Sequence, residues 1–397
     1  MLNLFILLHF IFTVRMYHRE NIFGIKSVYA FSFLIFIFTS HIYNTFLFSE
    51  YNATWGLHIS LFVTTILVNK IKSNNIKIEN LFRLPFSTKS LRKILIIMCV
   101  TCGVILVFAL AGLGHFFRFP TIGFFSCSVF FTSFLFINRE QYKKLYVNYL
   151  LLTLAIVILF VGALWSGFGR LLLLQFLTIS LFFTSFIFTK RMKLIKLLVI
   201  FAVPILIGFG GSLRKEVSIT EAIETGDGAG SAFSPLFDTE RIYRDLKNGS
   251  IESVNGESYV AAVLFYVPRS VWTSKPVGFG NQMVKWYFSS SYVIDTGFSL
   301  AGLYVAEAIG NFSYIGFLLG PLLMYIILFW INKFYGRNYE NYNYRTVFNA
   351  LIALAFMAAI PDFIWGGLQP FLVRASVSAL FIFLLYHFLR ITNSFKS

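Results

Sequence analysis

Two segments in the second half of the sequence gather the residues that could do chemistry. YVPRSVWTSKP (residues 266–276) places Arg269 and Lys275 on a stretch bracketed by two prolines. DTGFSLAGLYVAEAIGNFSYIG (residues 295–316) carries Glu307 in an apolar, glycine-rich context. Fixed cations bind phosphate oxygens, and a carboxylate in apolar surroundings is costly unless it has a partner or a role. These residues predict a reaction on an anionic, phosphate-containing substrate, with Glu307 as the general base.

The rest of the sequence predicts the environment of this chemistry. Hydrophobic residues make up 57% of the 397 positions and charged residues 13%, and the mean hydropathy is +0.75. Because a soluble domain carries about 25% charged residues, the composition predicts an all-α polytopic membrane protein. The net charge of +16 is better explained by loop charges that orient the chain in the membrane than by nucleic-acid binding.

Apolar runs that approach the length of a bilayer crossing predict about 11 transmembrane helices. They cover residues 2–14, 27–48, 55–69, 94–113, 119–137, 146–165, 171–189, 194–212, 312–332, 346–365 and 371–389. Residues 298–311 are either a re-entrant segment or part of the ninth span. The chain therefore divides into N-terminal membrane helices (1–212), a large loop with short helices (213–297) and C-terminal membrane helices (298–397).

Loop charges predict the orientation of these helices. Most of the 33 basic residues fall in every second loop, and the positive-inside rule makes those loops cytoplasmic. The N-terminus and the 213–297 loop are then expected outside and the C-terminus inside. Three arginines, Arg118, Arg170 and Arg374, remain at outer span ends. Snorkelling to the interface explains any one of them, but three together favour a site for a diphosphate, which a guanidinium binds bidentately.

Further polar residues are candidates for substrate binding. Arg214 and Lys285 add positive charge in the large loop, while Asp295 and Asn311 could position polar groups of a substrate. Asp362 and Asp295 are weaker candidates for the base. The alternative interpretation of Glu307 is a buried ion pair with one of the arginines.

The segment before and around Arg269 also has two interpretations. ESYVAAVLFYVPR (residues 257–269) is apolar enough to lie on the membrane or dip into it. The proline-bracketed cations that follow form either a fixed clamp for phosphate or an ordinary interfacial turn anchored by Trp272.

At three places the residues resemble a known family. VPRSVWTSKP resembles the I-P-R-x-x-W-x-x-K-P stretch of bacterial oligosaccharide repeat-unit polymerases of the Wzy (O-antigen polymerase) type. GLYVAEAIGNFSYIG is similar to their E-x-x-x-N-F-G-x-x-G segment, with Ser313 where glycine is more usual, and SGFGR resembles their S-G-x-R at an outer helix start. The motifs cover roughly residues 165–320, and a large outer loop between late spans matches as well.

The resemblance implies a GT-C-like glycosyltransferase in the bacterial inner membrane. Such an enzyme transfers a growing glycan from undecaprenyl diphosphate to a lipid-linked repeat unit, so its partners are the two lipid-linked oligosaccharides and membrane lipid. A chain-length regulator protein is compatible with this reading as a further partner, and no nucleic acid is expected. The expected catalytic residues are Arg269, Glu307 and Arg170; the expected substrate-binding residues are Arg214, Lys275, Arg374, Arg118, Asn311, Lys285 and Asp295.

The sequence lacks common nucleotide-binding and metal-binding motifs, and it fits two other classes of membrane protein less well. The sequence has no P-loop, no G-x-G-x-x-G after a strand, no H-E-x-x-H and no D-x-D pair. We therefore expect a reaction without cofactor or metal; a single acid that holds a divalent ion is the alternative. A lipid-linked oligosaccharide transporter would place charges inside several spans, where this sequence has few. An O-antigen ligase would be expected to carry a histidine in the 213–297 loop, which has none; another polyprenyl-linked glycan transferase is the remaining alternative.

Overall fold

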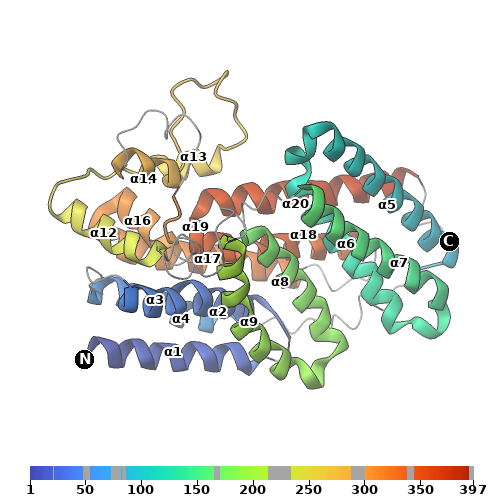
Figure 1. Ribbon diagram of the computed structural model, residues 1–397, viewed down its shortest axis with the longest axis horizontal. Helices are drawn as coiled ribbons and strands as arrows, with labels where there is room; N and C mark the ends of the chain where they lie inside the picture. The colour runs from blue at the N-terminus through green and yellow to red at the C-terminus, as the bar shows by residue number, and fades with distance from the viewer. Residues whose placement is uncertain are drawn as a thin grey trace.

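The computed structural model describes residues 1–20, 22–47, 54–72, 82, 86–164, 170–212, 234–287, 300–337 and 344–392. Residues 46, 47, 170, 205–212 and 335–337 are described by their backbone alone. Within these ranges the regular structure is all helical, with no strand (Figure 1). Helices are what an apolar chain requires in lipid, because each helix satisfies its own backbone hydrogen bonds.

The helices follow one another closely along the chain. The first half contains α1 (Leu2–Arg19), α2 (Ile25–Phe33), α3 (Thr39–Leu47), α4 (Trp55–Lys70), α5 (Thr88–Phe108), α6 (Arg118–Ile137), α7 (Arg139–Leu159), α8 (Arg170–Ile187) and α9 (Met192–Ser212). The second half contains α12 (Pro235–Lys247), α13 (Glu257–Val263), α14 (Phe279–Tyr287), α16 (Tyr304–Phe312), α17 (Gly316–Arg337), α18 (Tyr344–Ala358), α19 (Ile360–Gly366) and α20 (Leu368–Ile391). Three π-helical turns, Leu34–Phe38, Ala109–Leu113 and Phe160–Leu164, continue α2, α5 and α7.

Six helical stretches of the described chain are long and apolar enough to cross a membrane. A seventh is added if the bent pair Leu171–Ile187 and Thr189–Pro204, with 116° between its halves, is counted as one span. The class expected from the sequence, a helical membrane protein, agrees with this. The stretch Thr88–Ile137 contains two expected runs, and its chain changes direction near Gly112, where φ is +82°.

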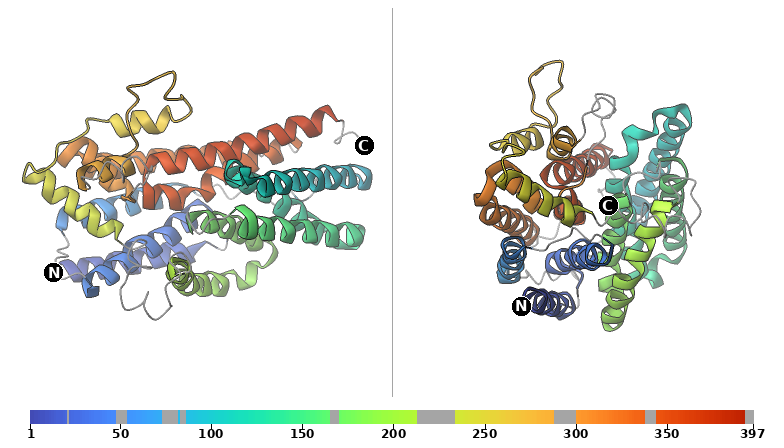
Figure 2. Two further views of the ribbon diagram at one scale, coloured as in Figure 1. Left: turned by 45° about the horizontal axis from the view of Figure 1, so that its top comes forward. Right: turned by 60° about the vertical axis from the view of Figure 1, so that its left-hand side comes forward.

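The helices form two groups that meet along α18 and α20. In one, α1, α2 and α4 pack with α16, α17 and α19; in the other, α6 packs with α7, α8 and α20 (Figure 2). Gly123 on α6 lies against the main chain of α20, because a Cβ at this position would be 2.4 Å from the carbonyl oxygen of Ser378. Small residues at a crossing allow this close approach between membrane helices.

The short helix α16 turns back along α17. A Cβ at Gly316 would lie 2.4 Å from the carbonyl group of Ala308, and a Cβ at Gly320 would lie 3.4 Å from Cα of Val305. Residues eight positions apart on one straight helix are about 12 Å apart, so α16 and α17 must run antiparallel. The described part of the 298–311 segment is therefore a separate short helix that lies beside α17 rather than continuing it.

Candidate functional site

Glu307 lies at the junction of α16, α13 and the start of α20. Its side chain is 1% exposed. Ser258 on α13 donates a hydrogen bond of 2.9 Å to Oε1, and the backbone N–H of Leu368 donates one of 2.6 Å to Oε2. In the described part of the chain, no lysine or arginine forms an ion pair with this carboxylate, so the ion-pair interpretation of Glu307 finds no support there.

Asn311 completes the polar cluster. It lies one turn after Glu307 on α16, and its amide nitrogen donates to the Glu307 carbonyl oxygen at 2.6 Å and to the Ser258 hydroxyl at 2.7 Å. Asn311 therefore orients the hydroxyl that faces the carboxylate. Its own Oδ1 is buried without a partner. This geometry makes Asn311 a residue that positions the Glu307 cluster, because it has no exposed surface that could contact a substrate.

The glycines of the GLYVAEAIGN segment allow neighbouring side chains to approach α16. A Cβ at Gly302 would lie 2.7 Å from the ring of Phe279, and a Cβ at Gly310 would lie 2.5 Å from the same ring. The Phe279 ring of α14 thus occupies the space that side chains at these two positions would fill. The glycine-rich pattern of the sequence is explained by this packing of α14 on α16.

Ser313 forms the turn between α16 and α17 in a strained backbone conformation. Its φ is +53° and its ψ is −131°, a region that glycine adopts readily and other residues rarely do. The family segment that this stretch resembles has glycine more usually at this position. The turn geometry gives the physical reason for that preference, and serine here costs about 1 kcal/mol or more of backbone strain.

Arg269 and Lys275 hold the backbone of the segment between α13 and α14. Arg269 donates from Nη1 to the carbonyl oxygen of Lys275 at 2.8 Å and from Nη2 to that of Pro276 at 3.3 Å. Lys275 donates from Nζ to the carbonyl oxygens of Phe265 and Val267 at 3.0 and 2.9 Å. Both cations thus bind carbonyl oxygens of this loop, and Arg269 remains exposed.

Arg374 forms an ion pair with Asp362. The Nη1 atom of Arg374 and the amide nitrogen of Gln175 on α8 each bind one carboxylate oxygen of Asp362, which is fully buried. The side chain of Arg374 is 16% exposed and lies over the ring of Phe119, with 5.9 Å between the guanidinium carbon and the ring centroid. Arg374 therefore already has a counter-charge, and Asp362 is a structural partner rather than an accessible base.

The remaining predicted residues are dispersed or not described. Arg118 donates from Nε to the carbonyl oxygen of Leu164 at 2.8 Å, and this bond joins the start of α6 to the end of the Phe160–Leu164 turn. Lys285 is exposed on α14. Arg170 is the first residue of α8, and its side chain is not described. Arg214 and Asp295 lie outside the described residues.

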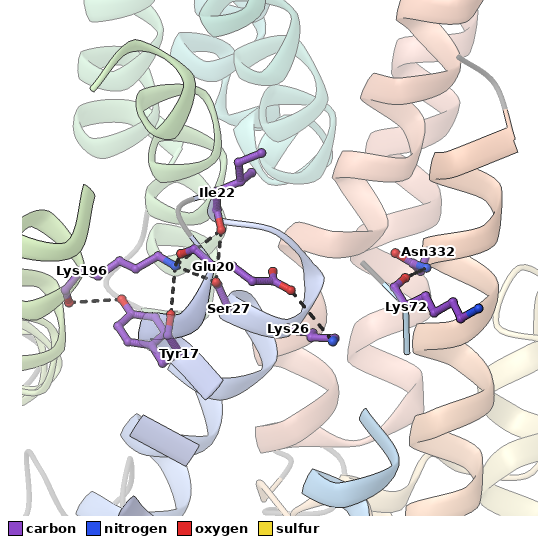
Figure 3. Close-up of polar contacts among 8 residues, drawn as sticks. All are labelled: Tyr17, Glu20, Ile22, Lys26, Ser27, Lys72, Lys196 and Asn332. Carbon is purple, nitrogen blue, oxygen red and sulfur yellow. Dashed lines mark hydrogen bonds and ion pairs between the residues drawn. The ribbon is translucent and has the colours of Figure 1, made fainter. Parts of the chain in front are cut away.

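A second buried cation, Lys196 on α9, has a structural role. Its side chain is 0% exposed, and Nζ donates to the carbonyl oxygens of Tyr17 and Glu20 and to the hydroxyl of Ser27 at 2.9, 2.7 and 2.8 Å (Figure 3). The Tyr17 hydroxyl in turn donates to the carbonyl oxygen of Lys196 at 3.2 Å. Lys196 thus fastens α9 to the turn between α1 and α2 and has no capacity left for a ligand.

The residues that contact Glu307 from other helices were not predicted from the sequence. Ser258 lies 49 positions before Glu307 and Leu368 lies 61 positions after it. Among the described residues, no group of three or more His, Cys, Asp or Glu side chains is arranged to hold a metal ion. The Glu307 cluster offers a buried carboxylate for proton transfer, and the loop between α13 and α14 offers the exposed Arg269 for an anion.

Comparison of the chain with protein-family models, with curated proteins and with solved structures finds no match. The fold and the apolar helices define the class: a helical, membrane-embedded protein.

Proposed function

We propose that this protein is a polyprenyl-diphosphate-dependent glycosyltransferase that polymerises lipid-linked oligosaccharide repeat units into a surface polysaccharide. The observation that carries the proposal is the Glu307 cluster. A carboxylate buried in the short helix α16, with hydrogen-bond donors but no basic partner among the described residues, is costly in a membrane protein. A buried carboxylate of this kind is suited to proton transfer, because an apolar environment favours its protonated form.

The reaction assigns a separate task to each charged group. A hydroxyl of the acceptor sugar attacks the anomeric carbon of the donor glycan, and Glu307 accepts the hydroxyl proton as a new C–O bond forms. The bond from that carbon to the diphosphate oxygen breaks, and the polyprenyl diphosphate leaves with the electron pair. This leaving group is already an anion, so it requires positive charge rather than a general acid. Arg269 supplies that charge, with Arg170 and Arg214 as further donors.

Access to Glu307 depends on α13. Both carboxylate oxygens accept hydrogen bonds in the closed cluster, one from Ser258 and one from Leu368. Leu368 begins the 24-residue helix α20 and is fixed, whereas Ser258 belongs to the seven-residue helix α13. We infer that α13 moves when the acceptor sugar binds, so that a sugar hydroxyl replaces Ser258 at Oε1.

The proposed function requires a particular orientation of the chain in the membrane. We propose a GT-C-like arrangement of about 11 spans in the inner membrane of a bacterium, with the N-terminus and the 213–297 loop outside and the C-terminus in the cytoplasm. The lipid-linked donor and acceptor then reach Glu307 from the outer leaflet. A single cysteine at exposed Ser250, labelled by an impermeant thiol reagent from outside the cell, tests this orientation.

Deletion of the gene, followed by gel analysis of the surface polysaccharide, tests the activity. Loss of the polymerase predicts lipid carriers capped with a single repeat unit, and a plasmid copy of the gene restores the ladder of long chains. Long chains that accumulate unattached would indicate a ligase instead. Repeat units trapped on the cytoplasmic side would indicate a transporter.

A further inference from the structure

The helix α13 buries its small residues and exposes its larger apolar ones, the reverse of a helix that packs its apolar face on a core. Its small residues Ser258, Ala261 and Ala262 are buried, whereas the larger Val260 and Val263 are 44% and 55% exposed. In water the larger apolar side chains would be expected to face the core, because burial of apolar area is what stabilises a helix on its neighbours. The outward valines indicate that the environment of this face is apolar.

The segment that follows continues the same apolar face. Tyr266 is 67% exposed and Val271 is 78% exposed. Between α13 and α14 this segment extends beyond the helix bundle in a sideways direction, across the axes of the long helices (Figures 1 and 2). α13 itself packs on the span helix α20. The exposed residues therefore point towards the space that surrounds a span.

Part of the backbone of this segment is hydrogen-bonded within the segment. The N–H groups of Val267, Val271 and Trp272 donate to the carbonyl oxygens of Leu264 and Pro268, and the Trp272 indole donates to Ser274. The side chains of Arg269 and Lys275 saturate further carbonyl oxygens of the same loop. These bonds lower the cost of placing the segment at the boundary between headgroups and acyl chains, where its remaining polar groups keep contact with headgroups and water.

Charge gives the chemistry of the surface that this segment fits. From α13 to Pro276 the only acid is Glu257, at the first position of α13, and the other charged residues, Arg269 and Lys275, are both cations. Anionic headgroups attract such cations, each by about 1 kcal/mol near a membrane surface, while the aromatic rings of Tyr266 and Trp272 suit the interface.

We propose that α13 and residues 264–276 form a wedge that inserts into the lipid leaflet beside α20, with Val263, Tyr266 and Val271 among the acyl chains. The wedge holds Arg269 at the depth of the lipid headgroups. This inference concerns where the segment lies and does not depend on the enzymatic activity proposed above.

Fluorescence quenching in vesicles tests the wedge. Cys99, Cys102 and Cys127 are replaced by alanine, and an environment-sensitive fluorophore is attached to Val271→Cys, to Val263→Cys or, as a matched control, to Ser250→Cys on the exposed turn after α12. The full-length protein is reconstituted in vesicles of phosphatidylethanolamine and phosphatidylglycerol. Equal unfolding temperatures before labelling establish that the variants are folded.

The wedge predicts blue-shifted emission at positions 263 and 271, strong quenching by lipids that carry a nitroxide on the acyl chain, and protection from aqueous iodide. The probe at position 250 should show the opposite pattern. Iodide quenching at 263 and 271 as strong as at 250 would place the segment in water and overturn the proposal. Protection from both quenchers would indicate a protein partner, such as a second copy of the chain, and would overturn it too.

Discussion

The carboxylate of Glu307 caps the first turn of α20: its Oε2 atom accepts a hydrogen bond of 2.6 Å from the backbone N–H of Leu368. Gly367, the residue before Leu368, has a φ of +82° and leaves room for the carboxylate. A Cβ at Gly367 would lie 2.4 Å from Oε2. The start of α20 and the position of the Glu307 carboxylate thus both require a glycine at position 367.

Gly367→Ala should therefore displace Glu307 and destabilise the protein. The backbone conformation of Gly367, with φ of +82° and ψ of −166°, is nearly confined to glycine and costs an alanine about 1–3 kcal/mol; the clash with Oε2 adds to it. We expect a lower unfolding temperature in detergent and loss of chain growth in cells. The matched control is Gly103→Ala on α5, where a Cβ meets no atom within 4 Å and alanine favours the helix. Equal stability and activity of the two variants would contradict the assigned contact.

The sequence predicted Glu307 because a charge stands out in an apolar, glycine-rich stretch, but it could not predict what surrounds the charge. One partner is a backbone N–H, which every residue except proline carries. The other is Ser258, a small residue of a type that occurs throughout the chain. Both are distant along the sequence, so no local spacing connects them with Glu307.

The helices were predictable for a different reason. Apolar runs in lipid have to form helices, and the expected runs that fall in the described chain lie on helices. The reversal at Ser313 was not predictable, because a serine with positive φ departs from the preferences that sequence reasoning uses. The pairing of Arg374 with Asp362 also escaped prediction, because Arg374 was expected to bind the diphosphate and Asp362 was a weaker candidate for the base.

The ion pair of Arg374 and Asp362 predicts a loss of stability when one partner is removed. Arg374→Ala leaves Asp362 buried without its counter-charge, which costs about 3–5 kcal/mol. The double variant Arg374→Gln, Asp362→Asn should recover part of this loss, and Arg390→Ala, at an exposed position on the same helix, should change little. Thermal unfolding of the purified variants measures the effect. A stable Arg374→Ala protein with a raised KM would instead make Arg374 a substrate-binding residue.

Arg269 should be required for chain growth while the protein remains abundant. We expect Arg269→Ala to abolish the polysaccharide ladder and Arg269→Lys to restore little of it, because lysine cannot bind a phosphate with two parallel hydrogen bonds. Arg269→Lys also loses one of the two bonds to the loop backbone, so the unfolding temperature is measured as well. Lys247→Ala at the exposed end of α12 is the control. A full ladder from Arg269→Lys would count against the phosphate contact.

Glu240 should make the docking of α12 depend on pH. Its Oε1 accepts a hydrogen bond of 2.8 Å from the N–H of Thr54 at the start of α4, while Oε2 is buried without a partner. Burial raises the pKa of Glu240 from 4.5 to about 7, against the opposing effect of the Thr54 bond. Burial likewise raises the pKa of Asp238 on the same helix from 3.8 to about 6.

The pKa values of Glu240 and Asp238 are both higher in the folded protein than in the unfolded chain. Between about pH 4 and pH 7 the folded protein therefore binds more protons than the unfolded chain. The stability contributed by the two acids is full below about pH 4 and is lost as the pH rises to about 7, by up to about 3 kcal/mol for Glu240. Glu240→Gln should keep the Thr54 bond and flatten the dependence of unfolding temperature on pH between 5 and 7.5. Glu252→Gln, at an exposed position, should leave that dependence as in the wild type; a wild-type slope in Glu240→Gln would refute the assignment.

The role of Glu307 is tested most directly by turnover and thermal unfolding measured on the same purified Glu307→Gln enzyme, with lipid-linked repeat units as substrate. Glutamine keeps the size of the side chain and an acceptor oxygen but cannot take up a proton. We expect turnover to fall by about 10²–10⁴-fold, while binding of the lipid-linked substrate persists and the unfolding temperature changes little. A variant that loses stability in proportion to its activity would reduce Glu307 to a cap of α20, and a stable, fully active variant would contradict the proposed base outright.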